Sequence, residues 1–167
     1  NQLAGIWIEQ TPGSAAPVSN VSGLVAWANV GNGARFVGGS AVKLRGSLLL
    51  ANQNNGVMVS TYTASALRSN DVSKIDLGTT GASGSVGANT VQASLGSNPN
   101  LGAGICLELD RLAGSTLNAA GNVFAGPTNC ATSTATLTQN KTCSNGVDYS
   151  VRVAGPSANN IVIATCQ

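Results

Sequence analysis

The sequence has no histidine among its 167 residues. Histidine is the side chain that most often transfers protons near neutral pH, and it is the commonest metal ligand. Its absence excludes Ser-His-Asp and Cys-His catalytic arrangements and most catalytic zinc sites. We therefore predict no catalytic residue, no bound metal and no cofactor.

Carboxylates are the remaining route to acid–base catalysis, and Asp and Glu number only six. Glu108 and Asp110 are the one close pair; they would share a face on a strand but point about 200° apart on a helix. Asp71 and Asp76 flank Lys74 but lack the spacing of a calcium loop. Solvated charges are the simpler interpretation, and a histidine-free hydrolase is the third functional alternative.

Charge of either sign is scarce, at 8% of the residues against about 25% in an average protein. The eight basic residues form no run, so the net charge of +2 predicts neither nucleic-acid binding nor attraction to an anionic membrane. The hydrophobic content of 43% still predicts a folded chain, although no apolar run is long enough for a membrane segment. A surface of Ser, Thr, Asn, Gln and Gly favours association, which suits assembling extracellular proteins.

The four cysteines all lie in the C-terminal part of the chain, at Cys106, Cys130, Cys143 and Cys166. An even number without a C-x-x-C pair predicts two disulfides, and hence an exported protein at the cell surface or outside the cell. Three pairings are open; our hypothesis is Cys106 with Cys166 and Cys130 with Cys143. We expect one domain over 1–167, with its disulfides confined to 106–166.

Hydrophobic alternation predicts a mainly β fold, either an antiparallel sheet or a sandwich. Residues 42–50 place apolar side chains on one face and Lys43 and Arg45 on the other, which is the period of a strand. With residues 57–63 they are expected to form a hairpin across an Asn-Gly turn. A second hairpin is expected from 147–153 and 161–165. No internal repeat of fixed period is found, and the Gly- and Ser-rich stretch 78–98 is left unassigned.

One short helix is predicted near 99–113. Asn98-Pro99 can begin it and Gly114 can end it. An apolar face follows the spacing of a helix, with Leu101, Ile105, Leu109 and Leu112. Alternation through Ile105, Leu107 and Leu109 is the competing strand interpretation; the agreement of caps and spacing favours the helix.

Aromatic residues make up only 4% of the chain. Carbohydrate-binding sites commonly use exposed aromatic rings for stacking. Trp7 and Trp27 lie in apolar, strand-like segments, so both are predicted to pack in the core. Exposure of either ring would favour carbohydrate binding.

Residues 98–167 resemble the globular part of bacterial type IV pilins and pseudopilins. The run 104–109, followed by Cys130, Cys143 and a C-terminal Cys166, is similar to the cysteine-closed region of that family. The resemblance implies an α+β pilin-like fold as the alternative, an assembling surface subunit, and a disulfide role for Cys166. Residues 1–33 do not match the family's N-terminal helix, because Pro12 and Pro17 interrupt them.

Two functions are therefore expected. The first is a non-catalytic extracellular structural subunit of a pilus, surface filament or shell, which associates with identical or related subunits through a β-edge or a terminal strand, at 5–10 or 160–166. The second is a secreted adhesin or carbohydrate-binding domain, whose partner is a glycan or another surface ligand.

Overall fold

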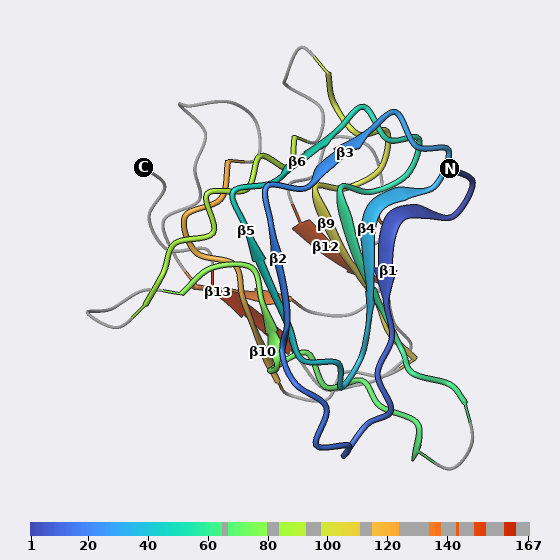
Figure 1. The fold of residues 1–167 in the computed structure, drawn as a ribbon, viewed down its shortest axis with the longest axis vertical. Coiled ribbons are helices and arrows are strands. Elements are labelled where there is room, and N and C mark those ends of the chain that lie inside the picture. Colours follow the sequence, from blue (N-terminus) through green and yellow to red (C-terminus); the bar gives the residue numbers. More distant parts are fainter. Residues whose placement is uncertain are drawn as a thin grey trace.

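The computed structural model describes residues 1–64, 67–79, 84–92, 98–110, 115–123, 134–137, 143, 149–152 and 159–162. These residues are mainly β-structure (Figure 1). The strands, in chain order, are β1 (Ala4–Ile8), β2 (Ser19–Ser22), β3 (Val25–Trp27), β4 (Asn32–Val37), β5 (Val42–Arg45), β6 (Leu48–Leu50), β7 (Val57–Ser60), β8 (Ile75–Asp76), β9 (Ile105–Glu108), β10 (Thr116–Asn118), β11 (Thr134–Leu137), β12 (Tyr149–Arg152) and β13 (Asn159–Val162).

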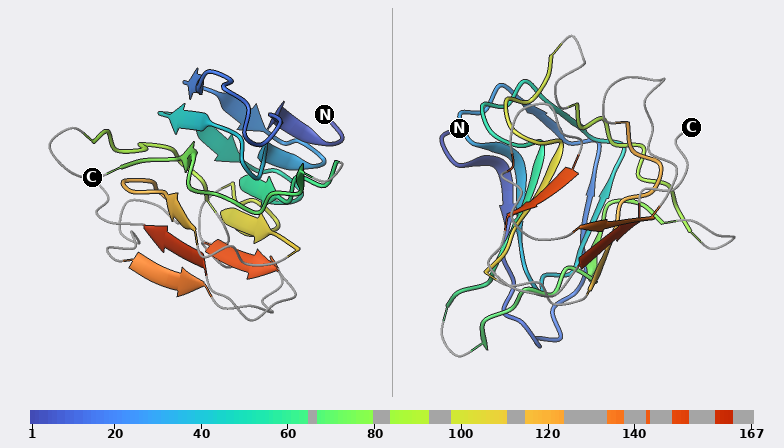
Figure 2. Two further views of the ribbon diagram at one scale, coloured as in Figure 1. Left: turned by 90° about the horizontal axis from the view of Figure 1, so that it is seen from below. Right: turned by 180° about the vertical axis from the view of Figure 1, so that it is seen from behind.

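The strands form three sheets, and consecutive strands enter different sheets, except β10 and β11, which both belong to the second sheet. Sheet A has the order β1-β4-β7-β9-β12, sheet B the order β11-β13-β10-β8-β5-β2, and sheet C the pair β3-β6. Each of the first two turns of the chain therefore contributes one strand to each sheet. Strands from successive turns lie side by side, and in Figure 2 the colours advance from blue to red along one axis. The fold is a parallel β-helix, a coil with three faces.

The mainly β prediction is confirmed, but the expectation of an antiparallel sheet or sandwich is wrong. Every strand pair is parallel except β11 with β13. Neither predicted hairpin forms. Residues 42–50 divide into β5 and β6, which belong to different sheets and are separated at Gly46, where φ is 56°. In the C-terminal region β12 belongs to sheet A and β13 to sheet B.

The predicted helix near 99–113 is also wrong. Residues 105–108 are β9, which pairs in parallel with β7 on one side and β12 on the other. Ile105 and Leu107 are fully buried, whereas Leu101, on the expected apolar face, is 56% exposed. The strand alternation of Ile105 and Leu107 was therefore the better guide, because both edges of β9 pair with strands that are distant in the sequence. Leu112 and Gly114 lie outside the described residues.

The core runs along the inside of the coil as columns of apolar side chains. In sheet A one column contains Phe36, Val59 and Leu107, which occupy the same register position on β4, β7 and β9. All three are completely buried. Sheet B contributes Leu44, Ile75 and Leu117 from its own strands. In such a column an inward side chain is covered on one side by the residue of the preceding turn and on the other by the residue of the next turn.

A repeat of variable length underlies these columns. Residues 28–37, 51–60 and 99–108 occupy equivalent places, and Asn29, Asn52 and Asn100 stand at the same point of each. The separations are 23 and 48 residues, so a search for a fixed period does not find the repeat. The longer separation includes the unassigned stretch 78–98, whose Thr90 forms parallel bridges to Leu48 and Val123.

The equivalent asparagines form a ladder inside the coil. The Asn29 side-chain amide donates to Asn52 Oδ1 at 2.8 Å, and the Asn52 amide donates to Asn100 Oδ1 at 2.8 Å. Ala28 and Ala51, immediately before two of them, have φ of 54° and 57°. This left-handed conformation bends the chain at a corner, where backbone N–H and C=O groups lose their sheet partners. The ladder supplies replacement hydrogen bonds for these groups.

Candidate functional site

The outer face of sheet A carries a row of aromatic, basic and sulfur-containing side chains. Because Ile6 and Phe36 point toward the core, their neighbours Trp7 and Arg35 point outward. Trp7, Arg35, Met58 and Cys106 are register partners on β1, β4, β7 and β9. Strands in a sheet lie about 4.8 Å apart, so this row, which we call the sheet A row, is roughly 14 Å long.

Trp7 begins the row, and its predicted core position is wrong. Its side chain is 44% exposed, and the Arg35 guanidinium carbon lies 4.4 Å from the centroid of its ring system. Arg35 Nε and Nη2 both donate to Ser60 Oγ, each at 3.2 Å. The guanidinium is therefore held in place by Ser60 and holds the indole in turn. Trp27 is also exposed, at 48%, but on β3 in sheet C.

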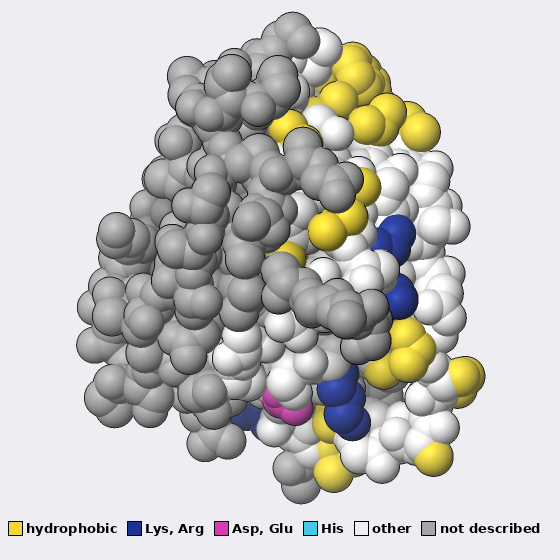
Figure 3. Space-filling model, turned by 90° about the vertical axis from the view of Figure 1, so that its left-hand side faces the viewer, with side chains coloured by type: hydrophobic (Ala, Val, Ile, Leu, Met, Phe, Trp, Pro, Cys, Tyr) yellow, Lys and Arg dark blue, Asp and Glu magenta, His cyan; other side chains and the backbone are white. Residues whose placement is uncertain are grey.

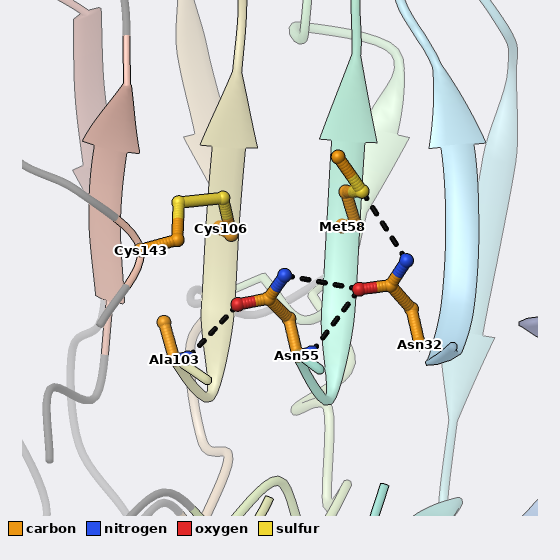
Figure 4. Close-up of a disulfide and its surroundings, with 6 residues drawn as sticks. All are labelled: Asn32, Asn55, Met58, Ala103, Cys106 and Cys143. Atoms are coloured by element: carbon orange, nitrogen blue, oxygen red, sulfur yellow. Dashed lines mark hydrogen bonds between the residues drawn. A yellow bond between two sulfur atoms is a disulfide. The ribbon is translucent and has the colours of Figure 1, made fainter. Parts of the chain in front are cut away.

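A pocket of about 270 Å³ lies at the other end of the row (Figure 4). It includes Met58 and Cys106 from the row itself. Asn55 donates from its amide to Asn32 Oδ1 at 3.0 Å, and its own oxygen accepts from Ala103 N–H at 2.8 Å. The complete lining is Asn32, Asn54, Asn55, Met58, Cys106, Glu108 and Cys143.

Amide and carboxylate side chains line much of the pocket. The Asn32 amide donates to Met58 Sδ at 3.3 Å. Because its Oδ1 also accepts from Asn55, hydrogen bonds fix the orientation of the Asn32 side chain. Asn54 is exposed, and its backbone N–H and C=O hydrogen-bond to Gly31 and Gly102. Glu108 is half-buried at the far end of β9. Amide and carboxylate groups together can donate to and accept from hydroxyl groups.

A disulfide joins Cys106 to Cys143 at the pocket wall, with a Cα–Cα distance of 5.7 Å. The prediction of a disulfide is confirmed, but both predicted pairings are wrong, since each contained one of these two cysteines. The predicted pairing assumed that Cys106 lies on a helix. On strand β9 its side chain points to the outer face of sheet A, where it meets Cys143. Cys130 and Cys166 lie outside the described residues.

Loss of this disulfide is expected to lower the free energy of unfolding by about 2–4 kcal/mol, because it closes a loop of 37 residues. The variant replaces Cys106 and Cys143 together by serine, and urea denaturation under non-reducing conditions measures the change. Peptide mapping should first recover the 106–143 linkage from the unmodified protein. A double variant as stable as the parent would contradict the prediction.

The carboxylates do not assemble a second site within the described residues. Asp110 follows β9 and forms a surface ion pair with Arg68 at 3.1 Å, whereas Glu108 lines the pocket. Asp76 pairs with Arg45 at 2.6 Å, and Asp71 accepts from Ser73 N–H. No group of three or more potential metal ligands occurs in the described part of the chain.

Comparisons with protein-family models, curated proteins and solved structures found no match for this chain. The resemblance to type IV pilins therefore stays a prediction. Among the described residues no helix is long and apolar enough to cross a membrane. The chemistry of the site must be argued from its own residues.

Sequence reasoning found the cysteines and Glu108 but missed Arg35, Ser60 and the asparagines of the pocket. The signal that could have located them is the variable repeat. Aligning residues 28–37 with 51–60 puts Arg35 beside Met58 and Asn32 beside Asn55. Those pairs are neighbours in the structure.

Proposed function

We propose that this chain is an exported, non-catalytic β-helix domain that binds carbohydrate on the outer face of sheet A. The observation that carries the proposal is the exposed Trp7 ring, fixed by Arg35 in line with a polar pocket. A rigid aromatic surface suits the C–H face of a sugar ring, and amides and a carboxylate suit its hydroxyl groups. The disulfide and the low charge support export.

The dimensions of the site favour a short oligosaccharide. Drug-sized ligands occupy pockets of about 300–1,000 Å³. The pocket here, at about 270 Å³, suits a group no larger than about one sugar ring. Trp7 stands outside it, on β1, and the sheet A row leads from Trp7 through Arg35 to the pocket residues Met58 and Cys106. One end of the ligand would enter the pocket, while another ring would stack on the indole.

Substituting Trp7 by alanine should weaken glycan binding by tenfold or more, since stacking of a ring on an aromatic side chain contributes about 1–3 kcal/mol in nucleic-acid sites. A glycan array would identify ligands of the parent protein, and calorimetry would measure both proteins. The matched control is Trp27→Ala, which removes an equally exposed ring from sheet C. An array without binding, or equal losses in both variants, would refute the proposal.

A second candidate is the structural subunit, and the edge of the sheets favours it. In the described chain β1, β2 and β3 each pair with one neighbour only. Ile6 and Val21 on these strands are half-buried, unlike their buried register partners Ala34 and Leu44. Figure 3 shows hydrophobic side chains on the described part of one face. Unpaired strand edges beside apolar side chains can pair with another chain.

Under this second proposal, a second copy covers the strand edges, and Val25→Lys should weaken self-association by placing a charge beside the β3 edge. Val25 is 64% exposed, and Leu101→Lys is the matched control because Leu101 is 56% exposed on a different turn. Sedimentation over a range of concentrations measures the effect. A parent protein that stays monomeric at high concentration would rule this candidate out.

A further inference from the structure

Arg35 carries a positive charge that no acidic side chain neutralises within the described residues. The ion pairs there join Arg45 to Asp76 and Arg68 to Asp110. Arg35 instead contacts two neutral groups, the Trp7 ring and the Ser60 hydroxyl. Glu9, which follows β1, is exposed and makes no ion pair with it. The sheet A row therefore has a cation at its second position.

The donors of Arg35 are only partly used. A guanidinium has five N–H donors in one plane. Two nitrogens, Nε and Nη2, donate to Ser60 Oγ, while Nη1 makes no hydrogen bond among the described residues. Up to three N–H groups therefore remain for a ligand. A guanidinium fixed in this way matches the two oxygens of a carboxylate better than a flexible ammonium would.

The place of Arg35 in the row determines which part of a ligand it can reach. Trp7 and Met58 are its neighbours on either side, each about 4.8 Å away across the sheet. The guanidinium covers one face of the Trp7 ring, so a sugar ring would stack on the other face, and a substituent that extends past the edge of the indole would meet the guanidinium. Hydroxyl groups farther along the ligand would meet the amides and Glu108 of the pocket.

We propose that the site selects acidic glycans, in which a uronate carboxylate on the ring stacked at Trp7 binds Arg35. This inference rests on the proposed carbohydrate function and names its ligand class. Arg35 acts as a specificity-determining residue, and Ser60 positions it. Opposite charges attract through solvent, so the preference should decrease as salt is added.

The test uses matched glycans that differ in one substituent. The probes are a glucuronate-containing tetrasaccharide, its carboxyl-reduced neutral counterpart, and a sulfated form of the neutral compound. We expect the parent protein to bind the uronate at least tenfold more tightly than the neutral sugar. The sulfated compound distinguishes recognition of carboxylate geometry from recognition of negative charge alone, and equal affinity for it would overturn the carboxylate assignment.

The variants test whether Arg35 produces the preference. Arg35→Gln should abolish the preference for the uronate over the neutral sugar. Arg35→Lys, which keeps the positive charge, should retain only part of that preference. Lys43→Gln is the control, because Lys43 is a half-buried cation on sheet B; it should keep the full preference. Affinity of each variant for the neutral sugar checks that the Trp7 ring still binds ligand.

The outcomes separate the two proposals. Binding of neutral sugars alone, or an acid preference that survives Arg35→Gln, would overturn the inference and leave the carbohydrate function standing. An array with no binding to any glycan would overturn both. A preference for the uronate that disappears with Arg35→Gln and persists with Lys43→Gln would establish the assignment.

Discussion

Replacing Asn52 with alanine is expected to lower the free energy of unfolding by about 3–5 kcal/mol. Asn52 is fully buried at the centre of the ladder. Its Oδ1 accepts from the backbone N–H of Asn29 at 3.1 Å and from the Asn29 amide at 2.8 Å. Its Nδ2 donates to Ala26 O at 3.1 Å and to Asn100 Oδ1 at 2.8 Å. Alanine leaves these buried groups without their partners.

The size of the effect follows from the number of groups affected. A buried donor or acceptor left unsatisfied costs about 1–3 kcal/mol. Removing the amide deprives two donors of their acceptor and adds a small void. Asn52→Asp keeps the shape but cannot donate, and it places an acceptor against Asn100 Oδ1. It should be at least as destabilising as alanine at neutral pH.

Asn54→Ala provides the control for this prediction. Asn54 lies in the same turn, two residues later, and its side chain is exposed. Its removal should change stability by less than about 0.5 kcal/mol. Guanidinium denaturation followed by tryptophan fluorescence compares the variants. Equal stability of Asn52→Ala and Asn54→Ala would show that the ladder contributes little.

The sequence predicted the inward and outward faces of strands better than their partners. Val42 and Leu44 are buried, and Lys43 and Arg45, which alternate with them, are half-exposed, as the alternation indicated. The same alternation occurs in a parallel coil and in a hairpin, because side-chain direction depends on one strand alone. Whether two strands pair in parallel or antiparallel depends on the segment that connects them. After β5 the chain turns at Gly46 and enters another sheet, so it does not return antiparallel to β5.

Trp7 shows why the candidate site was harder to predict. Ile6 and Ile8 flank it in an apolar run, so its size and neighbours indicated burial. Strand geometry places it opposite both isoleucines, on the outer face. Its stabilising contact, Arg35, lies one turn away, and no local pattern relates the two. The disulfide depends in the same way on a contact between segments distant in the sequence, since 37 residues separate its cysteines.

Glycine at position 33 follows from the ladder, and Gly33→Ala should destabilise the fold by about 3 kcal/mol or more. A Cβ there would lie 2.6 Å from Gly56 O, 2.8 Å from Asn52 Nδ2 and 3.0 Å from Leu49 Cβ. Gly5 meets the equivalent three groups, Gly33 O, Asn29 Nδ2 and Ala26 Cβ, one turn earlier. The glycines therefore form a column that leaves room for the asparagine ladder.

Gly46→Asn is the control for steric crowding. Gly46 has φ of 56°, and a Cβ there would meet nothing within 4 Å. Asparagine tolerates this conformation, so the cost should stay below about 1 kcal/mol. Thermal unfolding of both variants measures the difference. If Gly33→Ala were as stable as Gly46→Asn, then β4 could move away from the ladder without breaking it, and the hydrogen bonds of Asn52 would not limit how closely the turns approach. A large loss of stability in Gly33→Ala alone would mean that the ladder and the glycine column depend on each other. Each asparagine amide can then approach the next turn only where the facing residue has no side chain.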